Sequence, residues 1–409
     1  MNKNIDIFEI NEESLYIYNH IKGRGILIHP EVYKILLNYL SIEDLLDNNL
    51  DDSRDFWIKL SEYLSEMEFY EEESFIEKDT ELNVTWIITD YCNLFCKHCS
   101  HDAIPKGSKI IEADINILNA ILDKLKPGGL ILSGGEPMTL NNFTQVVDVL
   151  RDRYSGKLNL ATNGTLISKE NINIIKAFDS IDISIDGMTE KETDSIRGKG
   201  TYKKVINALA LLREINFKNI SLSMVFDKNN DYLYSKFIEY CKKSGYKPVC
   251  RYLSLVGRAK DNFSEDVEMY GILSGGFSVF DAHYECKACL NSVTVDSKGY
   301  VYPCNLFMDK RFRIGNILED NNIFDKMERN KKNNWYKEFS EYISWERSEC
   351  SDCKYRRACW SCPGMAYGYE QIHGNFRRNN QCKSKYLRIT EEMKNLEWIY
   401  NIYNDYQWM

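Results

Sequence analysis

Residues 90–99 read DYCNLFCKHC and carry three cysteines, Cys92, Cys96 and Cys99, in the spacing C-x3-C-x2-C. The apolar run directly before them, residues 84–89, is expected to be a β-strand. Three thiolates from one loop can bind one face of a metal cluster and leave a coordination position open for an exchangeable ligand. The pattern therefore predicts a metal-cluster site, and the alternative is three unligated cysteines in the core.

The chain around this loop is expected to alternate regularly between strands and helices. Apolar runs that predict strands lie at residues 84–89, 129–133, 158–162, 181–185, 220–226 and 249–256. Helical patterns follow them at residues 113–125, 142–152, 168–178, 202–215 and 233–243. Such β/α units predict an α/β fold, a partial six-stranded β/α barrel with parallel strands. The cysteine loop then falls at the carboxyl end of the first strand, where barrels of this kind place their chemistry.

Composition limits the class of protein. The chain has 409 residues, of which 44% are hydrophobic and 28% charged, so two or three domains of a soluble globular protein are expected. A net charge of -9 argues against a nucleic-acid partner. Without an apolar N-terminal segment or a run of about 18 apolar residues, neither secretion nor a membrane span is expected. In the cytoplasm, 13 cysteines point to metal binding instead of disulfides.

The pattern divides the chain at two places. Residues 1–80 are expected to form a small N-terminal domain, residues 81–262 the barrel, and residues 263–409 a loop-rich domain that holds most of the remaining cysteines. The N-terminal part begins with two alternating runs, residues 5–10 and 15–18, that predict a hairpin. A third strand at residues 26–28 and helices from Pro30 onward follow.

A second motif follows the second predicted strand. Residues 133–137 read SGGEP, and their two glycines allow the backbone to approach a ligand closely. Together with the cysteine loop, this motif resembles the radical S-adenosylmethionine (radical SAM) superfamily. In that superfamily three cysteines hold a 4Fe-4S cluster, and the open iron binds the amino and carboxylate groups of S-adenosylmethionine.

The resemblance implies a set of cofactor contacts. Residues that match family positions around the methionine and ribose of S-adenosylmethionine are Gly134, Gly135, Glu136, Pro137, Asn163, Ser184, Asp186 and Arg197. The guanidinium of Arg197 suits pairing with a carboxylate. His98 stands where the family usually has an aromatic residue, and it is expected to pack near the adenine. The implied chemistry is reductive cleavage of S-adenosylmethionine to a 5'-deoxyadenosyl radical, which abstracts hydrogen from a substrate.

The last third of the chain carries a further group of cysteines. Their spacing resembles the SPASM extension of peptide-modifying radical enzymes, which holds two auxiliary 4Fe-4S clusters. By position, the first cluster would take Cys286, Cys289, Cys304 and Cys362, and the second would take Cys350, Cys353, Cys359 and Cys382. Two structural zinc sites are the alternative, since paired C-x2-C is also zinc spacing. Cys241 and Cys250 are expected to pack as small hydrophobic residues.

These resemblances imply a radical peptide maturase with three 4Fe-4S clusters. Residues 1–80 resemble a winged-helix-like (PqqD-like) domain that would bind the leader of a precursor peptide; an ordinary structural cap is the alternative. A flavodoxin or ferredoxin would supply electrons. The other candidates are an anaerobic sulfatase maturase and a non-catalytic zinc scaffold. Asn305, which follows Cys304, favours the peptide maturase, because sulfatase maturases have an aspartate base there and an amide cannot accept a proton. The sequence does not identify the bond formed.

Overall fold

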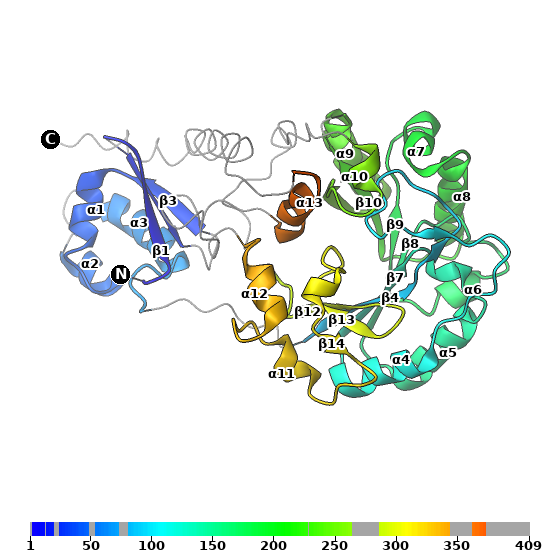
Figure 1. Cartoon of the computed structure of the whole chain (residues 1–409). Helices are drawn as coiled ribbons and strands as arrows, with labels where there is room; N and C mark the ends of the chain where they lie inside the picture. The colour runs from blue at the N-terminus through cyan, green and yellow to red at the C-terminus, as the bar shows by residue number, and fades with distance from the viewer. Residues whose placement is uncertain are drawn as a thin grey trace.

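A nine-stranded mixed sheet is the centre of the molecule (Figure 1). The computed structural model describes residues 2–12, 14–19, 24–48, 54–72, 81–227, 229–263, 286–343 and 362–373. Six consecutive parallel strands are β4 (Asn83–Thr89), β7 (Gly129–Gly134), β8 (Lys157–Thr162), β9 (Ser180–Ser184), β10 (Ile220–Phe226) and β11 (Lys247–Tyr252). The predicted order and direction of the six barrel strands are therefore confirmed.

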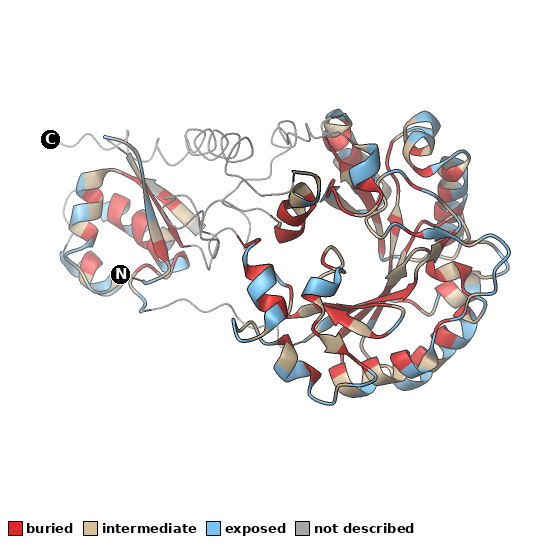
Figure 2. Cartoon of the chain, viewed as in Figure 1, coloured by how far each residue is buried: buried red, intermediate tan, exposed pale blue. Residues whose placement is uncertain are grey.

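Helices cover the outer side of this curved sheet (Figure 1). They are α4 (Ile115–Ala120), the π-helical turn η1 (Ile121–Leu125), α5 (Phe143–Arg153), α6 (Ile172–Ile175), α7 (Glu190–Arg197), α8 (Thr201–Glu214) and α9 (Tyr234–Ser244). Alternate strand residues such as Leu130 and Leu132 are fully buried, as a two-residue period requires. The helices bury the face toward the sheet and expose the other (Figure 2). No helix in the described part of the chain is long and apolar enough to cross a membrane.

Two helices differ from the prediction. The helix expected at residues 168–178 is only the short α6, because the side chain of Asn171 hydrogen-bonds the N–H of Ser168 and the carbonyl of Leu166 and holds a turn. Helix α7 was not predicted. Its N-cap is Thr189, whose hydroxyl accepts from the N–H of Glu192.

The sheet continues beyond the six predicted strands. Strand β12 (Ser292–Val295) pairs in parallel with β4, and β13 (Tyr300–Tyr302) and β14 (Gly315–Asn316) follow in antiparallel order. Helices α11 (Ile323–Met327), α12 (Asn334–Ser340) and α13 (Pro363–His373) complete this part. Aromatic side chains of this C-terminal part form a buried cluster. The ring centroid of Phe307 lies 4.7 Å from that of Phe312 and 5.2 Å from that of Tyr367. These residues share one hydrophobic core with the barrel.

The N-terminal residues form a unit with its own core. Its antiparallel sheet has the order β1 (Ile5–Asn11), β2 (Ser14–Asn19) and β3 (Arg24–Ile28). The helices are α1 (Pro30–Leu36), α2 (Ile42–Asn48) and α3 (Arg54–Glu66). Ile17, Leu36 and Leu64 are fully buried in a core separate from that of the barrel. The predicted hairpin, third strand and helices are thus present, while the role in leader binding stays a prediction.

Candidate active site

The cysteine loop leaves the carboxyl end of β4 and is held by short strand pairing between β5 (Tyr91–Cys92) and β6 (Ile104–Pro105). Each of its sulfur atoms faces a nitrogen donor. The N–H of Leu94 lies 3.3 Å from Cys92 Sγ, and the N–H of Ala103 lies 3.4 Å from Cys99 Sγ. Arg197 Nη1 lies 4.0 Å from Cys96 Sγ. This ring of donors stabilises negative charge on three neighbouring sulfurs.

The thiols themselves are poor anions without a metal. Burial raises the pKa of the Cys92 thiol to about 12, and it also raises the pKa of the Cys96 thiol. A metal cluster bonds to thiolates and removes this penalty, so the loop and its donors fit the iron–sulfur cluster that the motif predicts. In the described residues, no three His, Cys, Asp or Glu side chains converge closely enough to hold a single metal ion.

The SGGEP motif packs against this loop. The N–H groups of Gly135 and Glu136 donate to the carbonyls of Thr89 (2.8 Å) and Tyr91 (2.9 Å). A Cβ on Gly135 would lie 2.2 Å from the carbonyl oxygen of Tyr91, so the position requires glycine. The close backbone approach predicted for a ligand is therefore, for these two N–H groups, an approach to the chain's own cysteine loop.

Glu136 is fully buried and joins two strand ends. Its carboxylate accepts from the hydroxyl of Thr162 at 2.8 Å and from the N–H of Asn163 at 2.7 Å. Burial raises the pKa of Glu136 to about 6, although these hydrogen bonds act in the opposite direction. Asn163 in turn donates to Asn93 at 2.9 Å and faces Cys92 Sγ at 3.7 Å. Both residues thus position the cysteine loop.

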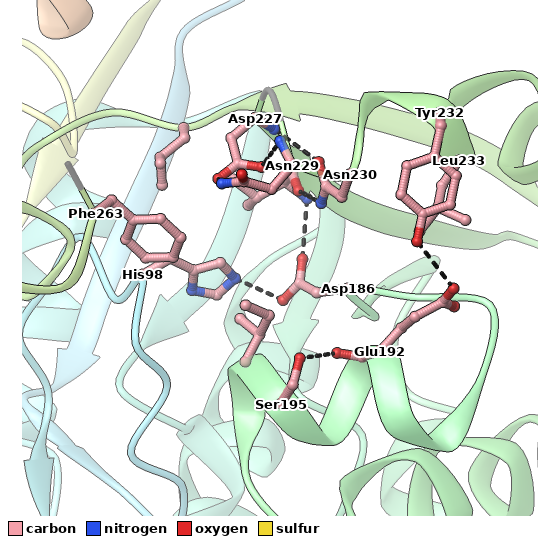
Figure 3. A pocket seen from close by; sticks show the side chains of 13 residues that line it. His98, Asp186, Glu192, Ser195, Asp227, Asn229, Asn230, Tyr232, Leu233 and Phe263 are labelled. Carbon is pink, nitrogen blue, oxygen red and sulfur yellow. Dashed lines mark hydrogen bonds and ion pairs between the residues drawn. The ribbon is translucent and has the colours of Figure 1, made fainter. Parts of the chain in front are cut away.

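Asp186 joins three further elements at the end of β9 (Figure 3). One of its carboxylate oxygens lies 2.5 Å from His98 Nε2 and 2.5 Å from Arg197 Nε, and the other accepts from the N–H of Val225 at 3.0 Å. Burial alone would raise the pKa of Asp186, but Arg197 and His98 outweigh it and hold that pKa well below its usual range. Asp186, predicted as a cofactor contact, has both oxygens occupied by protein groups.

A pocket opens beside this network (Figure 3). His98 and Asp186 line it together with the apolar side chains of Val225, Leu253 and Phe263. His98 Nδ1 is buried without a hydrogen-bonding partner among the described residues. Ser184, at the end of β9, is partly buried and is not among the residues that line the pocket. The pocket therefore offers an apolar wall and, at His98 Nδ1, a polar atom that the described fold does not use.

Comparison with known proteins identifies this arrangement. Residues 86–241 match the model of the radical SAM superfamily. The chain contains a radical SAM domain. Mycofactocin maturase MftC of Mycobacterium tuberculosis (strain CDC 1551 / Oshkosh) is 26% identical over 272 residues, which are 59% of this chain and 69% of that protein. The radical SAM resemblance predicted from the cysteine loop is thereby confirmed.

Two solved structures share the fold of the radical SAM domain. "Native anSMEcpe with bound AdoMet" has a TM-score of 0.58 at 20% identity and covers 80% of this chain and 100% of its own. Streptococcus suis SuiB bound to precursor peptide SuiA has a TM-score of 0.51 at 15% identity and covers 87% of this chain and 93% of its own. At these identities the likeness concerns the fold.

One residue that holds the radical SAM loop was missed in the sequence. Arg258, beyond β11, is buried and donates to the carbonyls of Cys96 at 3.0 Å and Ala103 at 2.6 Å. Its guanidinium lies 3.4 Å from the ring centroid of Phe95. The sequence signal that could have found it is a glycine, Gly257, directly before Arg258 and just past a predicted strand. The position requires glycine, because φ is +59° and a Cβ would lie 2.5 Å from the carbonyl oxygen of Cys99. No motif of this kind entered the sequence analysis.

The structure also brings four of the C-terminal cysteines into one region. Burial raises the pKa of Cys304 to about 12, and the nearby Cys362 and Cys286 raise it further. Burial raises the pKa of the Cys289 thiol, and the nearby Cys286 and Cys304 raise it as well. The backbone of Cys289 has a left-handed φ of +56°. Cys289 precedes β12 and Cys304 follows β13, so both lie at the amino end of β4, opposite the cysteine loop. Cys350, Cys353, Cys359 and Cys382 lie outside the described residues.

Two ion pairs of equal length provide a test of the Asp186 network. Asp186→Asn leaves the buried Arg197 without its counter-charge, and we expect a loss of about 3–5 kcal/mol in the free energy of unfolding. The matched control is Asp182→Asn, which breaks the 2.5 Å pair with the 52%-exposed Arg251. That loss should stay within about 1 kcal/mol. Urea unfolding of both variants makes the measurement, and equal losses would contradict the role assigned to Asp186.

Proposed function

We propose that this chain is a radical SAM peptide maturase, which abstracts hydrogen from a ribosomally made precursor peptide and installs a crosslink. The observation that carries the proposal is the three-thiol loop, with a donor at each sulfur, beside a partly apolar pocket at the carboxyl ends of parallel strands. The relative named mycofactocin maturase and the similar fold of SuiB bound to precursor peptide SuiA support it.

Each group of the site has a task in this proposal. Cys92, Cys96 and Cys99 hold a 4Fe-4S cluster, and S-adenosylmethionine binds beside it. When bound, these two groups supply a one-electron reductive cleavage that yields a carbon-centred radical. Asp186 keeps His98 in place at the pocket wall and Arg197 beside Cys96, and Glu136 keeps Asn163 against the loop. The apolar wall excludes water that would compete with the substrate for the pocket.

The C-terminal cysteines hold two auxiliary 4Fe-4S clusters in this proposal. Cys289 and Cys304 are partly buried and lie close enough to Cys286 and Cys362 for these thiols to raise one another's pKa, which supports the first cluster. An external flavodoxin or ferredoxin supplies the electrons. A zinc scaffold without catalysis is the alternative from another class, and it would leave the three-thiol loop and its adjoining pocket without a use.

An anaerobic sulfatase maturase is the competing enzyme. Such an enzyme needs a base on the substrate side, and the position after Cys304 is an amide, Asn305, whose oxygen lies 3.2 Å from Cys304 Sγ. With the N-terminal unit, whose hairpin and helices resemble a leader-binding domain, this favours the small peptide as substrate.

Mass spectrometry distinguishes these two substrates. We expect reduced, reconstituted enzyme with S-adenosylmethionine to remove two hydrogens from the precursor peptide encoded beside its gene, because a crosslink replaces two bonds to hydrogen. A peptide with a sulfatase motif serves as the control substrate. Formylglycine on that peptide, with an unchanged precursor, would reverse the choice.

Iron analysis tests the cluster assignment. Three 4Fe-4S clusters predict about 12 iron per chain after anaerobic reconstitution. Replacing Cys92, Cys96 and Cys99 with Ala should leave about 8 iron and abolish cleavage of S-adenosylmethionine. A wild-type value near 4 together with bound zinc would remove the auxiliary clusters from the proposal.

The N-terminal sheet provides a site for the leader. In the described residues its outer strands β1 and β3 pair only with β2, so the leader can add as a further strand at the free edge of the β1–β2 hairpin. Because this unit has its own core, removing residues 1–80 should spare cleavage of S-adenosylmethionine and abolish modification of a leader-bearing peptide. Unchanged modification by the truncated enzyme would show that the unit is a structural cap.

A further inference from the structure

We propose that the outer side of the cysteine loop is the docking surface for an acidic one-electron carrier protein. This carrier surface consists of Phe95, Lys97, Ile104, Lys106 and Lys109. The inference rests on the proposed function, because a chain that cleaves S-adenosylmethionine reductively takes up one electron for each cleavage. It goes beyond the proposed function because it assigns the place at which the electron enters the protein and the sign of the charge on the carrier protein.

The apolar part of the carrier surface is exposed and fixed in place. Phe95 is 61% exposed and Ile104 is 47% exposed, although both lie within a loop that buries two of its cysteines. Arg258 stacks on Phe95 with its guanidinium carbon 3.4 Å from the ring centroid, and it also donates to the carbonyl of Ala103, the neighbour of Ile104. An exposed aromatic ring held this firmly loses little entropy when a partner covers it.

The rim of the carrier surface is positively charged. Lys97, Lys106 and Lys109 have no carboxylate partner among the described residues, and Lys109 is held 5.0 Å from the ring centroid of Tyr91. Residues 93–110 contain one acidic residue, Asp102, and its carboxylate pairs with Arg258 at 3.1 Å. This basic rim stands out because the whole chain has a net charge of -9. A partner recognised here through charge is therefore acidic.

Hydrogen bonds to backbone carbonyls connect the carrier surface, and the Arg258 side chain that stacks on it, to the cysteines. The N–H of Lys106 donates to the carbonyl of Cys92 at 3.0 Å, and Arg258 donates to the carbonyl of Cys96 at 3.0 Å. A protein seated on the surface is thus separated from the thiols by a single loop. His98, from the same loop, lines the pocket, whereas Phe95, Ile104, Lys106 and Lys109 are not among the residues that line it.

The redox step at this surface is simple. The carrier's reduced centre loses one electron, and the centre held by the three thiols gains it. No bond forms or breaks, and no proton moves between the two proteins. A small apolar centre with a charged rim is suited to such short-lived redox encounters, which bury little area.

Charge reversal of the rim tests the proposal. The variant is Lys106→Glu/Lys109→Glu, and the matched control Lys203→Glu/Lys204→Glu makes the same change in net charge on α8. Each enzyme cleaves S-adenosylmethionine with one of two reductants, either an acidic flavodoxin kept reduced by its NADPH-dependent reductase or sodium dithionite. The readout is the initial rate of 5'-deoxyadenosine formation at several salt concentrations.

We expect the loop variant to lose rate with flavodoxin on the order of tenfold at low salt, because rim charges set the rate of encounter. The loss should shrink as salt rises, and it should be absent with dithionite and in the α8 control. Lys106→Gln/Lys109→Gln should fall between the loop variant and wild type.

Three results would overturn the carrier surface. Equal rates of the two charge-reversal variants with flavodoxin remove the docking role. An equal loss of rate with dithionite would mean that the lysines act in the active site or in peptide binding. A changed sedimentation coefficient of the loop variant assigns the surface to a second copy of the chain. Failure of wild-type enzyme to cleave S-adenosylmethionine with dithionite would instead refute the proposed function.

Discussion

The buried carboxylate of Asp186 is the interaction on which the site depends. It binds His98 from the cysteine loop, Arg197 from α7 and the backbone of Val225 in β10. A buried carboxylate without these partners would protonate or unfold its surroundings. Because Arg197 also faces Cys96 Sγ at 4.0 Å, the same network that satisfies the carboxylate sets the charge beside the thiols. Structure and chemistry are thus coupled at one residue.

The sequence predicts the six barrel strands because each coincides with a short apolar run between helical patterns, and it predicts the three thiols because their spacing is specific. It does not predict β12–β14, since strands of two to four residues leave too short a period to read. Arg258 was missed for another reason. Its contacts with Cys96 and Ala103 span more than 150 residues of sequence, and only the folded sheet brings these residues together.

The roles of Glu136 and Asp186 show a second limit. Motif matching assigned both residues to the cofactor, whereas their oxygens accept hydrogen bonds from Asn163, Thr162 and Val225 and lie against His98 and Arg197. A spacing pattern indicates that a carboxylate is needed at a position. It does not show whether that carboxylate binds a ligand or positions a loop that binds one. Both carboxylates are almost fully enclosed by protein, which supports a positioning role, while their contact with the cofactor stays a prediction.

The sheet also fixes the relation between the two cysteine groups. Cys92 follows the carboxyl end of β4, while Cys289 and Cys304 flank the β12–β13 hairpin at the amino end of the same strand. The separation is therefore close to the length of β4, about 20 Å for a strand of this size. Hydrogen bonds between β4 and β12 and a shared core hold this separation. The N-terminal unit packs a core of its own.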